Sequence, residues 1–386
     1  MILKSPQEEE AVRRMQKIYL DAERKIVAEI TRKRSLGYVD YAEVASLERV
    51  QAILTKMQDD TFTYAPVMVE TIFHGQGEKN AAGYANARAL TATQTAVVQT
   101  LVNNLLGEIL EVSETAYNSA REYLTVGRLE GQTLRSAALE AVASQEAVGA
   151  SWTMAQKQMT AELMGKGITG FVDKAGRKWS LTDYCNMAVR TTAKQAAVAS
   201  ILTEDDYDLW QIVKIDTTCP VCAVYEGRVY SKSGTNPDYP PLASAFGKID
   251  PDGPNTLDNT YLNLHPNCLH TLLRYTTIGK SEKQIQKDKD FSSFEKNPIT
   301  HDPRTKKQRE AYQKKMRDRQ KLVNDTHQWK RYKAVLGNEC PGWDDFIKHK
   351  QAGDDVYKSL ESKFRSFSIK ASKLDRELFN GLDGAV

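Results

Sequence analysis

The sequence predicts a mainly α fold with a small α+β core, and three observations support this fold class. Apolar residues recur every three or four positions through the first third of the chain, as they do on one face of a helix. A middle stretch has short alternating segments separated by glycine and proline, which favours short strands and turns. The last third is polar and basic but helix-prone. We therefore expect three regions: a helical N-terminal region at 1–164, an α+β domain at 165–280 and a basic helical C-terminal region at 281–386.

Long helices are expected throughout the N-terminal region. The apolar face of the first helix should consist of Met15, Ile18, Tyr19, Ala22, Ile26 and Ile30. The second helix should begin with Asp40 as its N-cap, and Glu43 would complete a capping box. Its apolar side should consist of Tyr41, Val44, Leu47, Leu54 and Met57. Further helices are expected at 85–114, 113–129 and 132–164. Because the polar residues of this region converge on no evident pocket, we expect it to be structural.

The middle of the chain is predicted to combine one helix with short strands. Residues 168–179 resemble a hairpin with glycine in its turn, and Ser180 should open a helix that runs to about Leu202. Further strands are expected at 209–216, 228–230 and 271–276. Residues 236–255 are crowded with proline, glycine, aspartate and serine, so we expect an irregular loop there.

Composition excludes several classes of protein. No apolar run approaches the roughly 18 residues that a membrane helix needs, so we expect no membrane anchor. The N-terminus lacks the apolar segment of a signal peptide, and we expect synthesis in a cytoplasm-like compartment. The five cysteines are odd in number and sparse, which argues against a disulfide framework. The net charge of +3 by itself indicates no partner.

Three of the five cysteines lie in a pattern with two histidines. Cys219-Pro220-Val221-Cys222 is a C-x-x-C motif after a predicted strand, and about forty residues later comes the segment 265–270, which reads HPNCLH. Two thiolates from one turn, with a cysteine and a histidine from a second, form a sound tetrahedral zinc set. The predicted ligands of a structural zinc are Cys219, Cys222 and Cys268, with either His265 or His270 as the fourth. The alternative is a group of packed thiols without metal, because the separation matches no standard short zinc finger.

Three catalytic interpretations of the same residues are less favoured. A metal-dependent nuclease could place its catalytic histidine beside a zinc turn, but it needs a further histidine or carboxylate, and no second histidine lies nearby beyond the pair already assigned. A thioredoxin-like motif should open a helix, whereas Glu226-Gly227 follows here and disfavours one. A cysteine hydrolase would pair Cys222 or Cys268 with His265, but adjacency in sequence is a poor guide to a catalytic pair. We therefore expect a protein that is not an enzyme.

The segment 304–333 is strongly basic and could contact DNA without reading its sequence. The candidate phosphate contacts are Lys306, Lys307, Arg309, Lys314, Lys315, Arg317, Arg319, Lys330 and Arg331. Three aromatic residues could add base stacking: Tyr312, Trp329 and Tyr332. The commoner interpretation of such a segment is a solvated charged helix.

Three pieces of the middle region together resemble the phage minor capsid protein 2 family, within the wider group of MuF-type head morphogenesis proteins. They are the segment 170–181 (GFVDKAGRKWSL), the C-x-x-C motif with Glu226 to Ser231 (EGRVYS), and HPNCLH at 265–270. In the tail, Trp329-Lys330-Arg331 and the segment 343–348 (WDDFIK) also look like this family. The resemblance covers roughly 165–350. Leu269 departs from the pattern, because the family usually has a basic residue at that position.

The resemblance implies a low-copy structural protein of a tailed-phage head, associated with the portal and the head interior. It implies no catalytic activity for the middle region. The expected partners are the portal and major capsid proteins and, through the basic segment, packaged double-stranded DNA. The expected location is the virion, after synthesis in the host bacterial cytoplasm. The competing hypotheses are a metal-dependent nuclease and a nonspecific DNA-binding protein of phage origin.

Overall fold

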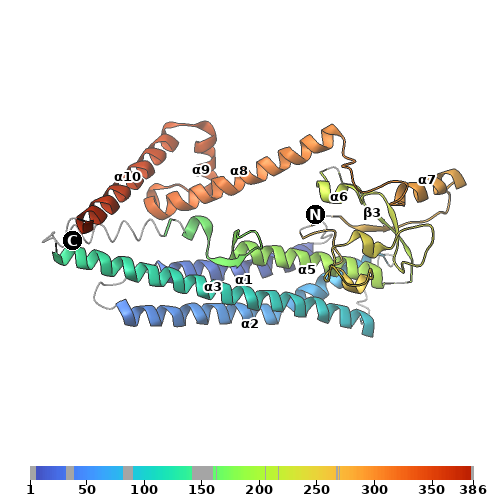
Figure 1. Ribbon diagram of the computed structural model, residues 1–386, viewed down its shortest axis with the longest axis horizontal. Helices are drawn as coiled ribbons and strands as arrows, with labels where there is room; N and C mark the ends of the chain where they lie inside the picture. The colour runs from blue at the N-terminus through green and yellow to red at the C-terminus, as the bar shows by residue number, and fades with distance from the viewer. Residues whose placement is uncertain are drawn as a thin grey trace. The chain divides into compact units, whose positions relative to one another are not determined.

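The computed structural model is mainly α-helical with two small antiparallel sheets, as the sequence predicts (Figure 1). It describes residues 6–31, 39–80, 90–140, 160–161, 163–204, 206–215, 217–266, 268 and 270–383. These residues pack as two compact units that each combine several segments of the chain. Unit 1 takes the described residues of 1–18, 59–109 and 185–317, and unit 2 takes those of 19–58, 110–184 and 318–386.

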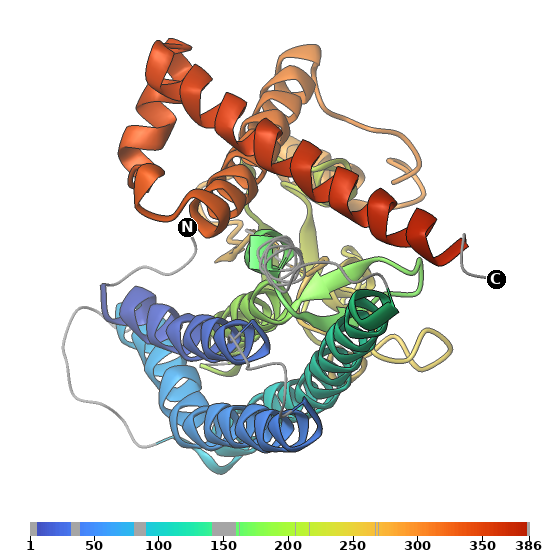
Figure 2. The same ribbon diagram turned by 90° about the vertical axis from the view of Figure 1, so that its left-hand side faces the viewer.

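Three long helices form the N-terminal part: α1 (Pro6–Ile30), α2 (Val39–Asn80) and α3 (Ala92–Glu140). In unit 1, segments of these helices lie side by side with α5 (Leu181–Thr203) (Figures 1 and 2). The predicted apolar face of α1 is confirmed, since Met15, Tyr19, Ala22, Ile26 and Ile30 are buried. Ile18, at the edge of that face, is half-buried.

Helix α2 differs from the prediction in two places. It begins at Val39, so Asp40 lies within the first turn and is not the N-cap. Leu54 and Met57 are buried as predicted, but Val44 is 59% exposed, so its assignment to the apolar side is wrong. The buried stripe of α2 runs through Ser46, Val50, Leu54 and Met57. At about 100° per residue, Val44 lies outside that stripe.

Helix α3 is continuous from Ala92 to Glu140, so the predicted helix breaks near residues 113 and 129–132 are wrong. The segment contains glycines but no proline, and isolated glycines cost a helix only about 1 kcal/mol each, which packing can offset. The predicted helical residues 85–89 and 141–159 lie outside the described part of the chain.

A hairpin and the start of α5 belong to unit 2. Strands β1 (Thr169–Val172) and β2 (Lys178–Ser180) pair antiparallel, which confirms the predicted hairpin. Asp173 closes its turn by accepting the backbone N–H groups of Ala175 and Arg177. Ser180 begins α5, because its hydroxyl accepts the N–H of Asp183 at 3.0 Å. The serine, glycine and aspartate of this stretch thus determine the local structure, as their ordinary preferences predict.

The second sheet, in unit 1, has the strand order β4-β3-β5 and is entirely antiparallel. Its strands are β3 (Leu209–Ile212), β4 (Val229–Ser231) and β5 (Leu272–Arg274). The predicted strand at 209–216 is therefore shorter than expected. Trp210 and Tyr230 are almost wholly buried and pack with residues of α5, including Val198 and Ile201. The long connection from β4 to β5 holds two short 3-10 helices, η1 (Leu242–Ala245) and η2 (Leu257–Asn259).

The C-terminal part is helical. It contains α7 (Glu282–Ser292), α8 (Lys306–Leu336), η3 (Gly337–Glu339), α9 (Trp343–Ala352) and α10 (Asp355–Asp383). In unit 2, α9 connects the end of α8 to α10 (Figure 2), and a small core of Tyr332, Cys340, Phe346 and Leu360 holds the three together. In the described part of the chain, no helix combines the length and the apolar character needed to span a membrane.

Candidate metal centre

The C-x-x-C motif forms a tight turn after β3. Cys219 is the N-cap of the single helical turn α6 (Pro220–Ala223), and its sulfur accepts the N–H of Cys222 at 3.3 Å. Pro220 suits the first helical position because it has no N–H to satisfy. The prediction that Glu226-Gly227 disfavours a helix is correct only beyond Ala223, because one turn does open at the motif. Gly227, with φ of 76°, then reverses the chain toward β4.

Sheet topology explains why the second motif meets the first. The C-x-x-C turn follows the C-terminal end of β3, and the segment at 265–270 directly precedes β5. In an antiparallel pair, the end of one strand lies beside the beginning of the other. Ile212 at the end of β3 pairs with Leu272 at the start of β5. This pairing brings together cysteines and histidines that are more than forty residues apart.

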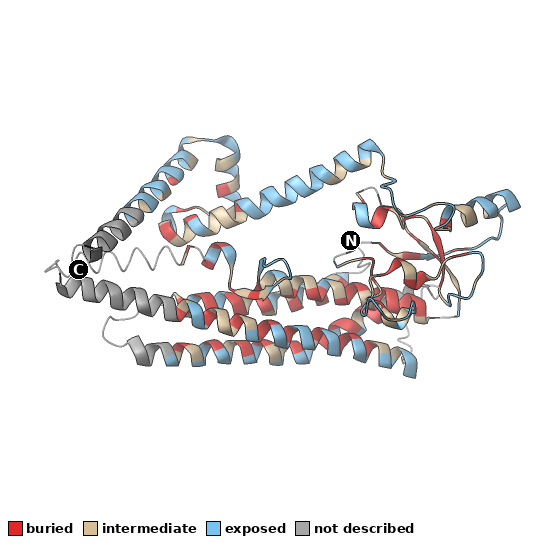
Figure 3. Ribbon diagram, viewed as in Figure 1, coloured by how far each residue is buried: buried red, intermediate tan, exposed pale blue. Residues whose placement is uncertain are grey.

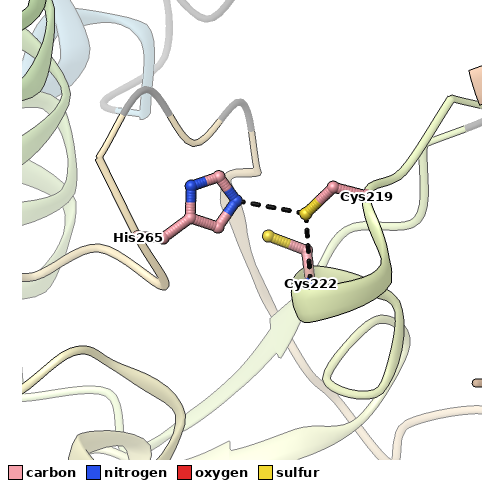
Figure 4. A group of neighbouring side chains, drawn as sticks. All are labelled: Cys219, Cys222 and His265. Carbon is pink, nitrogen blue, oxygen red and sulfur yellow. Dashed lines mark hydrogen bonds between the residues drawn. The ribbon is translucent and has the colours of Figure 1, made fainter. Parts of the chain in front are cut away.

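All five predicted metal ligands come together in unit 1. The Cys219 sulfur lies 3.2 Å from Nε2 of His265 (Figure 4). The sulfurs of Cys222 and Cys268 are 3.8 Å apart, and the Cys268 sulfur is 3.4 Å from Nδ1 of His270. The donors form two groups that share Cys222, and within each group the donor atoms lie within 4.8 Å of one another.

Within each group of three donors, the separations are close to those around a tetrahedral zinc ion. With Zn–S of about 2.3 Å and Zn–N of about 2.0–2.1 Å, tetrahedral angles put neighbouring donors about 3.6–3.8 Å apart. The separations of 3.2, 3.4 and 3.8 Å lie within a few tenths of an ångström of that range. Thiolates and imidazoles are also the donors that zinc prefers. Each group of three could therefore hold a metal ion, with Cys222 common to both.

Each histidine is oriented through the ring nitrogen that faces away from the sulfurs. Nδ1 of His265 lies 2.7 Å from the carbonyl oxygen of Pro266. Nε2 of His270 lies 2.5 Å from Oε1 of Glu226, which also accepts the N–H of Ile215 at 3.1 Å. Metal-binding histidines usually donate their second nitrogen to such an oxygen, which sets the tautomer and the ring orientation.

Glu226 is a site residue that the sequence analysis missed. In the sequence it was interpreted as part of the turn with Gly227 and of the family segment 226–231, with no role at the metal site. Its side chain is 7% exposed and faces a histidine that is 44 residues away along the chain. A charged residue four positions after Cys222 was the available signal, but acidic residues are common in turns and this one had no evident partner.

The thiols of the cluster have strongly shifted pKa values. A hydrogen bond with Cys222 lowers the pKa of Cys219 to about 3, and contact with His265 adds to this effect. A hydrogen bond with Cys222 likewise lowers the pKa of Cys268 to about 4. The same two contacts raise the pKa of Cys222 itself above its usual range. These shifts favour the thiolate form of Cys219 and Cys268, which is the form that binds a metal.

The histidine pKa values shift in the complementary direction. The hydrogen bond with Cys219 raises the pKa of His265 to about 8. Burial lowers the pKa of His270, but hydrogen bonds with Cys268 and Glu226 outweigh it and raise the pKa to about 9. Without a metal these shifts favour thiolate–imidazolium pairs, and a bound metal would replace the imidazolium protons.

Six of the nine predicted DNA contacts belong to unit 1, and Arg319, Lys330 and Arg331 belong to unit 2. Seven of the nine are exposed in the first half of α8 (Figure 3): Lys306, Lys307, Arg309, Lys314, Lys315, Arg317 and Arg319. The other two lie in the packed half of the helix, where Lys330 is half-buried and the Arg331 guanidinium lies 5.9 Å from the Phe364 ring centroid. The stacking role predicted for Tyr332 is wrong, since this residue is only 4% exposed. Trp329 donates its indole N–H to Pro341 and packs on Trp343.

The fold and the site together define a helical protein whose small sheet carries a cysteine–histidine cluster able to hold a metal. The sequence profile of the family Phage minor capsid protein 2 matches residues 3–334, so the chain belongs to that family. Searches of curated proteins and of solved structures returned no match. Family membership confirms the resemblance found in the sequence and implies a structural role in the phage capsid, with the virion as its location.

Proposed function

We propose that the protein is a minor component of a tailed-phage head, MuF-like in its middle region, that lies in the head interior next to the portal. The observation that supports this proposal is the family match, which extends over residues 3–334 of 386. Its proposed partners are the portal and major capsid proteins. The three predicted regions, 1–164, 165–280 and 281–386, remain our proposal for its domain organisation.

Quantitative mass spectrometry of purified particles tests this role. We expect the protein at a small fraction of the abundance of the major capsid protein, and cross-links from it to the portal. Its presence in infected cells combined with its absence from particles would contradict the proposal. An abundance equal to that of the major capsid protein would contradict the minor role.

The proposed role of the metal centre is structural, with zinc held by Cys219, Cys222, Cys268 and His270. We prefer His270 to His265 as the fourth ligand because it is 6% exposed and is oriented by a buried carboxylate. Bound zinc would cross-link the turn after β3 to the turn before β5. Hydrolytic zinc keeps an open position for water, whereas Cys222 and Cys268 are 1% and 4% exposed. The burial therefore favours a structural ion over a nuclease centre.

Metal analysis of the purified chain tests the centre. We expect one zinc per chain, and we expect Cys222→Ser to lose it. Cys340→Ser is a matched control, because Cys340 is also fully buried but belongs to the separate core around Phe346. Zinc retained by Cys222→Ser, or cutting of plasmid DNA with added divalent metal, would overturn the structural interpretation.

A second proposed function is nonspecific contact with packaged DNA. The observation that favours it is the run of exposed lysines and arginines over the first half of α8. Such side chains neutralise phosphates, and the affinity then falls with rising salt.

A further inference from the structure

Two hydrogen bonds attach the beginning of α8 to the turn that carries Cys219 and Cys222 (residues 217–223, here called the metal turn). The Arg304 guanidinium donates to the carbonyl oxygen of Thr218 at 3.2 Å, and the ammonium group of Lys315 donates to the hydroxyl of Thr217 at 3.3 Å. Thr218 is 1% exposed and directly precedes the ligand Cys219. The metal turn and the first three turns of α8 are therefore in direct contact within unit 1.

Arg304 is placed as the central residue of this attachment. Its side chain is only 8% exposed although it is charged. The guanidinium is paired with Asp302 at 2.8 Å and lies 5.4 Å from the ring centroid of Tyr312. Hydrogen bonding to Asp302 raises the Arg304 pKa, and the charge of Cys219 acts in the same direction. Arg304 thus links the metal turn to α8: its guanidinium binds the carbonyl of Thr218 on one side and contacts the ring of Tyr312 on the other.

The attachment determines which face of α8 points outward. Gln308, Ala311 and Tyr312 are half-buried, and with Lys315 they follow the spacing of one helix face. Exposed Lys306 and Arg317 lie on the opposite side, with one acid, Glu310, 4.0 Å from Lys306, and exposed Lys307 and Lys314 lie on the adjoining flank. From residue 306 to residue 317 the helix rises about 16 Å, roughly the axial length of five DNA base pairs.

We propose that the metal turn orients α8 through Arg304, so that the outward face with Lys306, Lys307, Lys314 and Arg317 binds the phosphate backbone of double-stranded DNA. This inference rests on the proposed DNA contact and adds two claims to it. Only one face of the helix binds, and metal loading maintains that orientation. Arg304 is a positioning residue and Lys315 belongs to the attached face, although both are cations in the same basic segment.

The first experiment measures amide hydrogen exchange in the segment 306–317 of the zinc-loaded full chain. Arg304→Ala should raise exchange there by about fivefold or more, as expected for a lost charge-assisted hydrogen bond, while Arg304→Lys should recover part of the protection. Removal of zinc should give the same change as Arg304→Ala. Gln313→Ala, at an exposed position in the same segment, is the control and should leave the exchange unchanged. Equal exchange in all forms would overturn the attachment.

The second experiment measures binding of a 25-base-pair duplex by fluorescence anisotropy between roughly 50 and 200 mM salt. Lys314→Ala and Arg317→Ala should each reduce the slope of log affinity against log salt by about 0.9, while Lys315→Ala should leave it unchanged. Equal effects of all three substitutions would overturn the single binding face. Absence of binding by the wild type at the lowest salt would reject the DNA contact itself, and the exchange experiment would still decide the role of Arg304.

Discussion

Replacing Glu226 by glutamine tests the metal centre most directly. The carboxylate accepts two hydrogen bonds, from Nε2 of His270 at 2.5 Å and from the N–H of Ile215 at 3.1 Å, and is 7% exposed. The amide of glutamine is nearly the same size and can keep one of these contacts, but it carries no charge. A charge-assisted hydrogen bond contributes about 1.5–3 kcal/mol and a neutral one about 1 kcal/mol, so we expect a loss of roughly 1–2 kcal/mol.

That loss should appear mainly as weaker zinc binding. Removal of a carboxylate that orients a ligand histidine typically lowers metal affinity by about 10–100-fold. Converted to free energy, this range overlaps the loss of roughly 1–2 kcal/mol expected from the hydrogen bond. Competition with a chromophoric chelator measures the zinc affinity directly. Glu295→Gln, at an exposed position in the same unit, is the control and should leave the affinity unchanged.

The reasoning is refuted if the zinc affinity of Glu226→Gln lies within twofold of wild type while the protein remains folded by circular dichroism. A comparison of His270→Ala with His265→Ala then identifies the fourth ligand. We expect the larger loss of affinity for His270→Ala. A larger loss for His265→Ala would assign that position to His265, which faces Cys219 at 3.2 Å.

Three further predictions concern stability. Gly170→Ala should lower the free energy of unfolding by about 1–3 kcal/mol, because a Cβ there would lie 2.7 Å from the backbone Cα of Leu181. Gly107→Ala should raise the free energy of unfolding by about 0.5–1 kcal/mol, because a Cβ there meets no atom within 4 Å. Thermal denaturation of the two variants checks the predicted loss and the predicted gain of stability. Burial raises the pKa of Glu23, which accepts the N–H of Ile168, so its contribution to stability should be complete below the unfolded-state pKa and decrease as the pH rises through the raised folded-state pKa. Glu23→Gln should remove that part of the pH dependence in denaturant titrations, and an unchanged profile would contradict it. Phe346→Ala should cost about 3–5 kcal/mol, because Phe346 is wholly buried, and the loss should appear as early melting of α9 and α10 in hydrogen exchange.

Local patterns in the sequence predicted much of the secondary structure. The apolar spacing of α1, the hairpin closed by Asp173 and the helix begun by Ser180 all depend on neighbours within a few residues. The same reasoning was wrong for Val44 and for the breaks in α3. Short windows do not show which of several apolar residues will face a partner helix, or whether packing will maintain a helix through a glycine.

The sequence by itself identified the donor groups of the candidate metal centre, because thiols and imidazoles in two short motifs indicate either a metal site or a packed thiol cluster. Only the tertiary structure decided how those groups are used. The pairing of β3 with β5 brings the two motifs together, the reversal at Gly227 turns Glu226 toward His270, and Arg304 connects the cluster to α8. Each of these contacts joins residues that are distant along the chain. Such contacts depend on strand pairing and on the packing of whole elements, and short-range sequence patterns do not record them.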